Sequence, residues 1–357
     1  MPRVSVFHPA YFTRFRCKCA DCRTVCCRGW RITLSEAEYF RALGQSCSGA
    51  LRRRMDVAFY PVDHPDAEEY AYISPDRDGC CSLRDPDGLC ALQRECGEDV
   101  LPAVCRLYPR SVKPGAVTEA SCSGSCERTV ELLMEEPFPL PFVTTELETR
   151  AAIPADAPAD AATQRKMRDA LAVFQSGANA HDGFLRLANA LGVPLPAAWG
   201  MAPYLREARQ LLLHFGVHSV TLCDESEAAL DELALRDGVT DVSIARYAEA
   251  EARLRADLPE AERWFANILA NHLFYERFPA PSPSVSPRDA LYALGAVYIL
   301  LRFFCVVFHD PARARARFAD EAAAVLRFVE HTDFYTRDAR RTHADAASLD
   351  TPRPSVL

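Results

Sequence analysis

The sequence predicts a mainly α-helical protein: an N-terminal cysteine-rich metal-binding domain with little regular structure, followed by a C-terminal helical bundle. Two observations predict this fold class. Thirteen of the 15 cysteines lie between Cys17 and Cys126. From about residue 163 onward, apolar residues recur at steps of three and four, with Pro or Gly in the gaps. The predicted parts are a cysteine-rich domain (1–136), a Pro/Ala-rich connector (137–162), an α-helical domain (163–338) and a polar tail (339–357).

The helical half contains seven segments with this periodicity, separated by turn-forming residues. They read RKMRDALAVFQSG, PYLREARQLLLHFGVH, DESEAALDELALRDG, IARYAEAEARLRADL, EAERWFANILANHLFYERF, RDALYALGAVYILLRFFCVVF and ADEAAAVLRFVEHTDFY. The sixth contains the most apolar stretch, residues 290–308. Because Arg302 lies inside it and a charge in mid-membrane is costly, we expect a buried helix of the bundle and not a membrane span.

Composition and charge exclude several classes of protein. Apolar residues make up 49% of the chain, which is typical of a globular protein, and the net charge of −8 argues against a nucleic-acid-binding surface. The first 15 residues have neither a long apolar run nor a cleavage site of small residues, so they do not read as a signal peptide. We therefore expect a cytoplasmic protein with no membrane partner.

Placement in a reducing compartment favours metal binding over disulfides for so many thiols, and an odd total does not suit a complete disulfide framework. Four thiolates suit either zinc or an iron–sulfur cluster. Zinc sites usually take closely spaced ligand pairs, whereas Cys80, Cys90 and Cys105 stand at wide gaps, so spacing favours iron–sulfur and leaves zinc open. The turn signal at Asp87-Gly88 predicts a hairpin that brings Cys80 beside Cys90.

The alternative to metal ligation is that a cysteine simply packs in the core, since free cysteine is a good small core residue. We expect it for Cys223 and Cys305, which lie in apolar helical segments. Ligation and packing are equally expected for four others: Cys19, Cys47, Cys81 and Cys96.

Several segments, taken in order, resemble the flagellin lysine-N-methylase family. The opening segment is Phe15-Arg-Cys17-x4-Cys22-x3-Cys26-Cys27-Arg-Gly-Trp30-x-Ile32. Later segments are Cys80-x2-Leu83, Gly88-Leu89-Cys90-x-Leu92-Gln93, Gly97-Glu98-Asp99-Val100-Leu101, Cys105-x2-Tyr108-Pro109-Arg110 and Ser125-Cys126-Glu127. Weaker matches in the helical half are Asn267-x3-Asn271-His272-Leu273-Phe274, Phe278-Pro279 and Phe328-Val329-Glu330-His331.

The resemblance implies methyl transfer from S-adenosylmethionine to lysine ε-amines of flagellin or a related surface protein, with a cysteine-ligated iron–sulfur cluster, most simply 4Fe-4S. The cysteines that match the family's, and so the implied metal ligands, are Cys17, Cys22, Cys26, Cys27, Cys80, Cys90, Cys105 and Cys126. The chain departs from the family at Cys81 and Glu127, where the family usually has proline. Cys122 could replace Cys126 as a ligand.

Methyl transfer to lysine needs a neutral amine, which requires desolvation or a nearby base. The sequence offers Glu330-His331 as a carboxylate and an imidazole, Asn267, Asn271 and His272 on one helical segment, and Tyr108 and Arg110 beside a predicted ligand. No catalytic or S-adenosylmethionine-binding residue can be assigned from these. The alternative function is a non-enzymatic or redox protein that binds an iron–sulfur cluster or zinc and serves in interactions.

Overall fold

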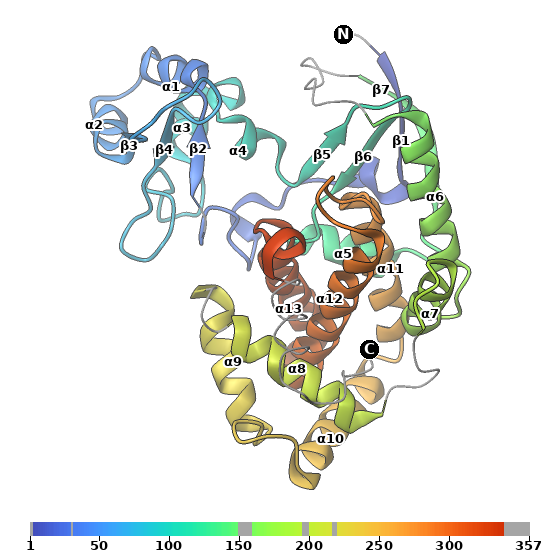
Figure 1. Ribbon diagram of the computed structural model, residues 1–357. Coiled ribbons are helices and arrows are strands. Elements are labelled where there is room, and N and C mark those ends of the chain that lie inside the picture. The colour runs from blue at the N-terminus through green and yellow to red at the C-terminus, as the bar shows by residue number, and fades with distance from the viewer. Residues whose placement is uncertain (1–2, 30, 149–158, 195–199, 216–219, 339–357) are drawn as a thin grey trace. The chain divides into compact units, whose positions relative to one another are not determined.

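The computed structural model describes residues 3–29, 31–148, 159–194, 200–215 and 220–338, and it divides into two compact units (Figure 1). The cysteine unit consists of residues 16–108. The helical unit joins residues 1–15 to residues 109–357. The first division therefore falls after residue 15 and the second after residue 108, whereas the first boundary that the sequence predicts is near residue 136. The predicted polar tail, 339–357, and Trp30 of the opening motif lie outside the described residues.

The cysteine unit contains more regular structure than the sequence predicts. An antiparallel sheet has the order β2-β4-β3, with strands Ile32–Leu34, Ala71–Ile73 and Phe59–Pro61. Helices α1 (Glu36–Leu43), α2 (Gly49–Ala58), α3 (Ala91–Cys96) and α4 (Ala103–Leu107) and the short turns η2 (Cys19–Asp21) and η3 (Glu98–Val100) complete it. Ser35 and Glu38 form a capping box that begins α1. This local helix signal was overlooked because the segment was interpreted through its cysteines. The core packs around Leu34, Leu51 and Leu92.

A four-stranded sheet of order β5-β6-β1-β7 forms one part of the helical unit. The strands are β5 (Arg110–Lys113), β6 (Thr118–Cys122), β1 (Arg3–Pro9) and β7 (Phe142–Glu148). The N-terminal strand β1 lies between two later strands, parallel to β6 and antiparallel to β7. This pairing ties the N-terminus and residues 109–148 to the helical unit, and it places β7 inside the segment predicted as a connector.

Helices form the remainder of this unit, and the prediction of a mainly α protein is confirmed. They are α5 (Glu127–Glu135), α6 (Ala161–Gln175), α7 (Ala180–Ala190), α8 (Met201–Phe215), α9 (Val220–Glu232), α10 (Asp241–Asp257), α11 (Ala261–Tyr275), α12 (Pro287–Val307) and α13 (Ala314–Glu330), with short turns η1 (Ala10–Arg14), η4 (Pro311–Arg313) and η5 (Phe334–Asp338). Each of the seven predicted segments contributes a helix. The sequence misses α7, which Asn179 caps by accepting a hydrogen bond from the Asp182 N–H.

Helix α11 is the centre of the helical unit, and it contacts α5, α6, α7, α12 and strand β6. Twelve of its fifteen residues are buried, including the polar Asn267, Asn271 and His272. At the sheet side, Phe274 meets Phe7 and Phe142 with ring centroids 5.7 and 4.9 Å apart. Such aromatic contacts fix the helix against β1 and β7. The polar residues of α11 are therefore held rigidly inside the unit.

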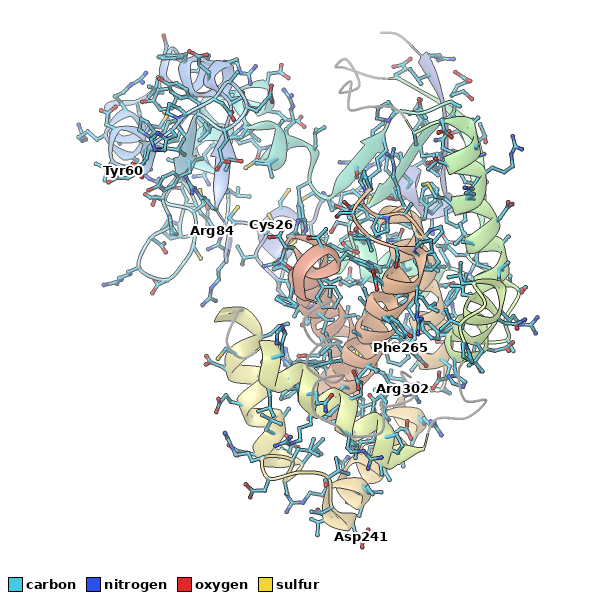
Figure 2. All side chains as sticks on the ribbon, viewed as in Figure 1. Cys26, Tyr60, Arg84, Asp241, Phe265 and Arg302 are labelled. Carbon is cyan, nitrogen blue, oxygen red and sulfur yellow. The ribbon has the colours of Figure 1, made fainter. Side chains whose placement is uncertain are left out.

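Helix α12 is the one described helix that is long and apolar enough to cross a membrane, but 89% of its most apolar window is buried inside the structure. Arg302 in this helix donates to Glu251 and Glu262, at 2.8 Å in each case, and its guanidinium lies 5.7 Å from the Phe265 ring centroid (Figure 2). The arginine that argues against a membrane span is thus part of an ion-pair cluster joining α10, α11 and α12, as expected for a helix in a protein core.

Replacing Arg302 with alanine should lower the free energy of unfolding by about 2–3 kcal/mol. It would leave Glu251, 15% exposed, without its counter-ion, while the more exposed Glu262 limits the loss. Urea unfolding of the purified protein measures the change. Arg253→Ala is the control, because this arginine pairs with Glu249 at an exposed position and should cost no more than about 0.5 kcal/mol. Equal effects of the two substitutions would contradict the prediction.

Candidate functional site

Two places in the structure concentrate chemistry-bearing side chains, one in each unit. In the cysteine unit, backbone pairing brings the first and second cysteine segments together. The Cys81 N–H donates to the Cys27 carbonyl at 2.7 Å, and Arg28 and Cys80 form a β-bridge. The Cys26 and Cys27 sulfur atoms lie 3.9 Å apart. Two cysteine segments that are more than 50 residues apart in the sequence thus lie side by side.

The predicted turn at Asp87-Gly88 is confirmed, but the neighbour predicted for Cys90 is wrong. Gly88 adopts a φ of +88°, a conformation that glycine adopts readily, and the Gly88 N–H donates to Asp85. The chain then returns so that Cys90 forms a bridge with Arg84, whereas Cys80 pairs with Arg28. The residue opposite Cys90 is thus four positions after Cys80, and this tighter hairpin is why Cys80 does not lie opposite Cys90.

Cys105 on α4 is the thiol around which the others gather. Burial raises its pKa strongly, and the nearby thiols of Cys81, Cys90 and Cys26 raise it further. Burial also raises the pKa of Cys90, and it raises that of Cys81 to about 11. We call Cys26, Cys81, Cys90 and Cys105 the thiol group. Its buried members are neutral at pH 7 unless a cation lies beside them, so they fit either a packed core or a metal centre.

The other predicted ligands are distributed more widely. Cys17 is exposed and Cys22 half-buried, both close to the short turn η2. Cys126 belongs to the helical unit, where its thiol lies near enough to Cys122 to raise the pKa of that buried thiol. Within the described part of the chain, no three His, Cys, Asp or Glu side chains are arranged as they would be around a metal ion. The eight-cysteine ligand set therefore stays a prediction.

Packing accounts for several remaining thiols. Cys305 is 1% exposed in the core of the helical unit, as predicted, and its thiol lies 3.8 Å from the Phe318 carbonyl oxygen. Cys47 and Cys96 pack against the core of the cysteine unit. Cys81, for which ligation and packing were equally expected, is a buried member of the thiol group, whereas the predicted ligand Cys80 is only half-buried.

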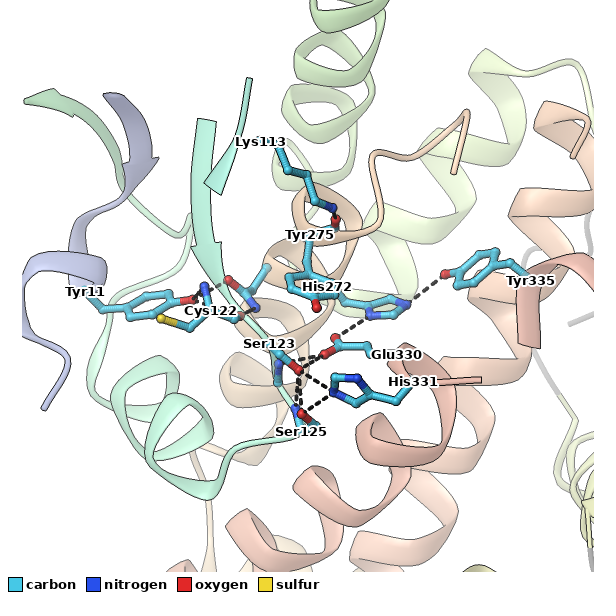
Figure 3. A network of polar contacts seen from close by, with 12 residues as sticks. Tyr11, Lys113, Cys122, Ser123, Ser125, His272, Tyr275, Glu330, His331 and Tyr335 are labelled. Atoms are coloured by element: carbon cyan, nitrogen blue, oxygen red, sulfur yellow. Dashed lines mark hydrogen bonds and ion pairs between the residues drawn. The ribbon is translucent and has the colours of Figure 1, made fainter. Parts of the chain in front are cut away.

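The second concentration is a buried polar network in the helical unit, centred on the Glu330 carboxylate at the end of α13 (Figure 3). The Ser123 hydroxyl and the Gly124 N–H donate to its Oε2, at 2.5 and 2.9 Å. His272 Nδ1 lies 2.8 Å from Oε1. Both the Glu330 and the His272 side chains are fully buried. The Ser123 hydroxyl, the Gly124 N–H and His272 thus replace the hydrogen bonds to water that the buried carboxyl group loses.

Tyr335 contacts the other nitrogen of the His272 ring. Its hydroxyl lies 2.8 Å from His272 Nε2, and burial raises the pKa of Tyr335 well above its ordinary value, so the phenol keeps its proton. The His272 ring is thus held between the Glu330 carboxyl group at Nδ1 and a neutral phenol at Nε2.

Two serines connect Glu330 to His331. Ser125 Oγ lies 2.5 Å from Ser123 Oγ and 2.8 Å from His331 Nε2. Because Ser123 donates to Glu330 and accepts the Ser125 N–H, its hydroxyl has room only to accept from the Ser125 hydroxyl. His331 Nε2–H then donates to Ser125. The hydrogen bonds run in one direction, from the imidazole of an exposed residue to the buried carboxylate.

Some of the candidate residues predicted from the sequence belong to this network, and others do not. Glu330, His331 and His272 meet in this network, although they come from two distant segments. Asn271 joins its edge, where its Oδ1 accepts from Tyr11 at 2.6 Å and its Nδ2 donates to the Cys122 carbonyl at 3.0 Å. Asn267 does not: its Nδ2 donates to the carbonyls of residues 133 and 136 and holds the end of α5.

Arg110 and Tyr108 also lie apart from this network. Arg110 donates to the Phe15 carbonyl at 3.3 Å and stacks on the Phe15 ring, and Tyr108 belongs to the cysteine unit. Sequence reasoning missed Ser123, Ser125 and Tyr335. Both serines lie in the SCSGSC segment. A Gly between two hydroxyl residues was the available signal there, but the segment was interpreted only through its flanking cysteines.

Three curated proteins are similar to this chain, each over 111 residues, or 31% of it. Proteins named Lysine-N-methylase from Salmonella typhimurium and Salmonella choleraesuis are each 30% identical, and the matched part is 27% of their length. The Flagellar biosynthetic protein FliU of Salmonella muenchen is 28% identical over 65% of its length. No protein-family profile and no solved structure matches the chain. The resemblance to lysine-N-methylases is thus confirmed for about a third of the chain, which spans about a quarter of the length of the first two relatives.

Proposed function

We propose that this protein is an N-methyltransferase of protein lysine residues, with S-adenosylmethionine as methyl donor and flagellin or a related surface protein as substrate. The similarity to proteins named Lysine-N-methylase carries the proposal. The name of the third relative, a flagellar biosynthetic protein, supports a flagellar substrate. The proposed place of action is the cytoplasm.

The polar network of the helical unit supports this chemistry. A lysine amine attacks a sulfonium methyl group only in its neutral form, so the enzyme must remove a proton that is normally bound at pH 7. Glu330 supplies a carboxyl oxygen in a dry environment, and the Ser123–Ser125–His331 chain offers a path for that proton to an exposed residue.

We further propose that the protein holds a cysteine-ligated iron–sulfur cluster, 4Fe-4S in the simplest case, with zinc as the alternative. The donors fit such a centre in kind, because thiolate sulfur binds both iron–sulfur clusters and zinc, and the thiols of Cys81, Cys90 and Cys26 lie near enough to Cys105 to raise its pKa. Cys26, Cys90 and Cys105 are common to the thiol group and the predicted ligand set. A bound cluster would supply the positive charge that buried thiolates need and would hold the three segments together.

Incubation of the purified protein with S-adenosylmethionine and flagellin monomers should add methyl groups to flagellin lysines. Peptide mass spectrometry detects them as mass increments of one methyl group on lysine. Omission of the donor is the control, together with a flagellin whose surface lysines are replaced by arginine. An unchanged flagellin mass, with no binding of S-adenosylmethionine by calorimetry, would overturn the proposed function.

Replacing Cys90 or Cys26 with serine should remove bound metal and lower the melting temperature far more than Cys223→Ser does. A lost ligand forfeits the stabilisation that metal binding gives to folding, whereas a packing thiol contributes about 1 kcal/mol. Iron and zinc contents of the purified variants, the visible absorption spectrum and calorimetric melting measure the effect. Equal melting temperatures and equal metal contents would count against these ligands, and a colourless protein with one zinc would favour the alternative metal.

A further inference from the structure

Arg54 on helix α2 binds the loop that follows Cys81. Its Nε and Nη2 donate to the Ser82 carbonyl, at 3.2 and 2.7 Å, and Nη2 also donates to the Arg84 carbonyl at 3.1 Å. Its Nη1 donates to the Asp85 carboxylate at 2.5 Å. One guanidinium thus binds three positions of a short segment, which the planar fork of arginine allows and the compact ammonium of lysine does not.

This loop carries two members of the thiol group. The Arg84 N–H donates to the Cys81 carbonyl at 3.0 Å, and Arg84 forms a β-bridge with Cys90. Cys81 is buried in the core of the cysteine unit, and Cys90 and Cys105 pack against the same core. A movement of the segment that Arg54 binds would therefore displace the thiols of Cys81 and Cys90 relative to that of Cys105.

Asp85 extends this contact to helix α3. Its Oδ1 accepts from Arg54, and its Oδ2 lies 3.1 Å from Nη1 of Arg94 on that helix. The Asp85 side chain is 17% exposed, so solvent screens its ion pair with Arg54 less than it screens a fully exposed pair. Arg54 is itself fixed by α2, because Leu51 and Met55 of this helix are buried in the core. The loop is thus connected to two helices.

The charge of Arg54 also suits a metal centre at these thiols. Burial raises the pKa of Cys81 and of Cys90, and the Arg54 guanidinium lies near enough to oppose both shifts. A centre held by four thiolates, with either zinc or an iron–sulfur core, carries a net negative charge. Burial disfavours that charge and a nearby guanidinium favours it. Arg54 therefore offers such a centre both a fixed fork that sets position and a cation.

We propose that Arg54 is a positioning residue for a metal centre at the thiol group: its hydrogen bonds to the loop hold the Cys81 and Cys90 thiols beside Cys105, where the group can ligate a metal. The metal part rests on the proposed function. Arg54 acts through the loop and is not itself a ligand, because a guanidinium has no lone pair to give. Residues that orient metal ligands typically contribute tenfold to a hundredfold to metal affinity, so the loss of Arg54 should be measurable.

Two variants of the full-length protein separate position from charge. Arg54→Met removes both the hydrogen bonds and the charge, whereas Arg54→Lys keeps the charge and loses the fork. In competition with a chelator, bathophenanthroline for iron or a pyridylazo dye for zinc, Arg54→Met should hold metal about tenfold to a hundredfold less tightly than wild type, with Arg54→Lys between the two. Arg53→Met is the matched control, since the exposed Arg53 on the same helix makes none of these contacts and its loss should change metal retention less than twofold.

Alkylation by N-ethylmaleimide gives a second readout, the position of the thiols themselves. Peptide mass spectrometry of the purified proteins follows each cysteine separately. Arg54→Met should label Cys81 and Cys90 about tenfold faster than wild type does, because the loop opens more often once its hydrogen bonds to α2 are lost. Cys305, buried in the core of the helical unit, should label at the wild-type rate in every variant and reports that the variant is folded.

The outcomes separate this inference from the proposed cluster. If wild type holds metal and Arg54→Met retains it as tightly, the assignment of Arg54 is overturned and the proposed cluster stands. Equal loss of metal from Arg53→Met and Arg54→Met would also overturn the assignment, because a general weakening of α2 would explain both. If wild type holds neither iron nor zinc, the proposed cluster fails. Faster labelling of Cys81 and Cys90 in Arg54→Met then still supports Arg54 as the residue that positions these thiols, and equal labelling overturns it.

Discussion

The helical unit depends on one physical constraint, the removal of the Glu330 carboxylate from water. An anion without solvent is tolerated only where donors replace the lost hydration. The donors come from the loop between β6 and α5 and from α11, so satisfying one carboxylate fixes three segments that are far apart in the sequence. Gly124 belongs to the same constraint: a Cβ at this position would collide with Leu326 on α13, so glycine lets the loop approach the helix closely.

Thiols of the cysteine unit are also removed from water, but their surroundings differ from those of Glu330. Among the described residues, the neighbours that act on Cys105 are the thiols of Cys81, Cys90 and Cys26 and the carboxyl of Glu38, all of which make its ionisation less favourable. Such a group is stable either as neutral S–H groups in a small core or as thiolates around a cation. Burial without donors gives the group a reason to bind a metal that an exposed pair such as Cys17 and Cys19 does not have.

The helices were predictable from the sequence because their apolar residues repeat at helical spacing, and α12 and α11 are buried on nearly every side. Helix α7 was not, since Gly183 and the asparagines near its ends weaken the pattern. In the structure Gly183 packs against the Phe174 carbonyl of α6, where a Cβ would be too close, so the residue that obscures the helix allows it to pack. The position of β1 between β6 and β7 was also not predictable, because pairing over more than 100 residues leaves no local signal.

Part of the candidate site was also predictable from the pattern of residues. His272, Glu330 and His331 are unusual polar residues in apolar helical segments, and that pattern singled them out. Ser123 and Tyr335 could not be identified, because serine and tyrosine are common at loops and helix ends and only the fold shows which hydroxyls face the carboxylate. For the cysteines, spacing predicted the density of thiols but not which would be neighbours: the hairpin places Arg84 opposite Cys90, while Cys80 forms its bridge with Arg28.

The polar network belongs to the helical unit and the thiol group to the cysteine unit. This division bears on how methyl transfer and a metal centre could coexist in one protein. Displacement at a sulfonium carbon moves no electrons between substrate and metal; it requires a neutral nucleophile held in line with the methyl group. The groups proposed to handle the proton of an amine, Glu330 and His272, belong to the helical unit, and the thiol group belongs to the cysteine unit. A cluster bound by these thiols would therefore act first on the folding of residues 16–108.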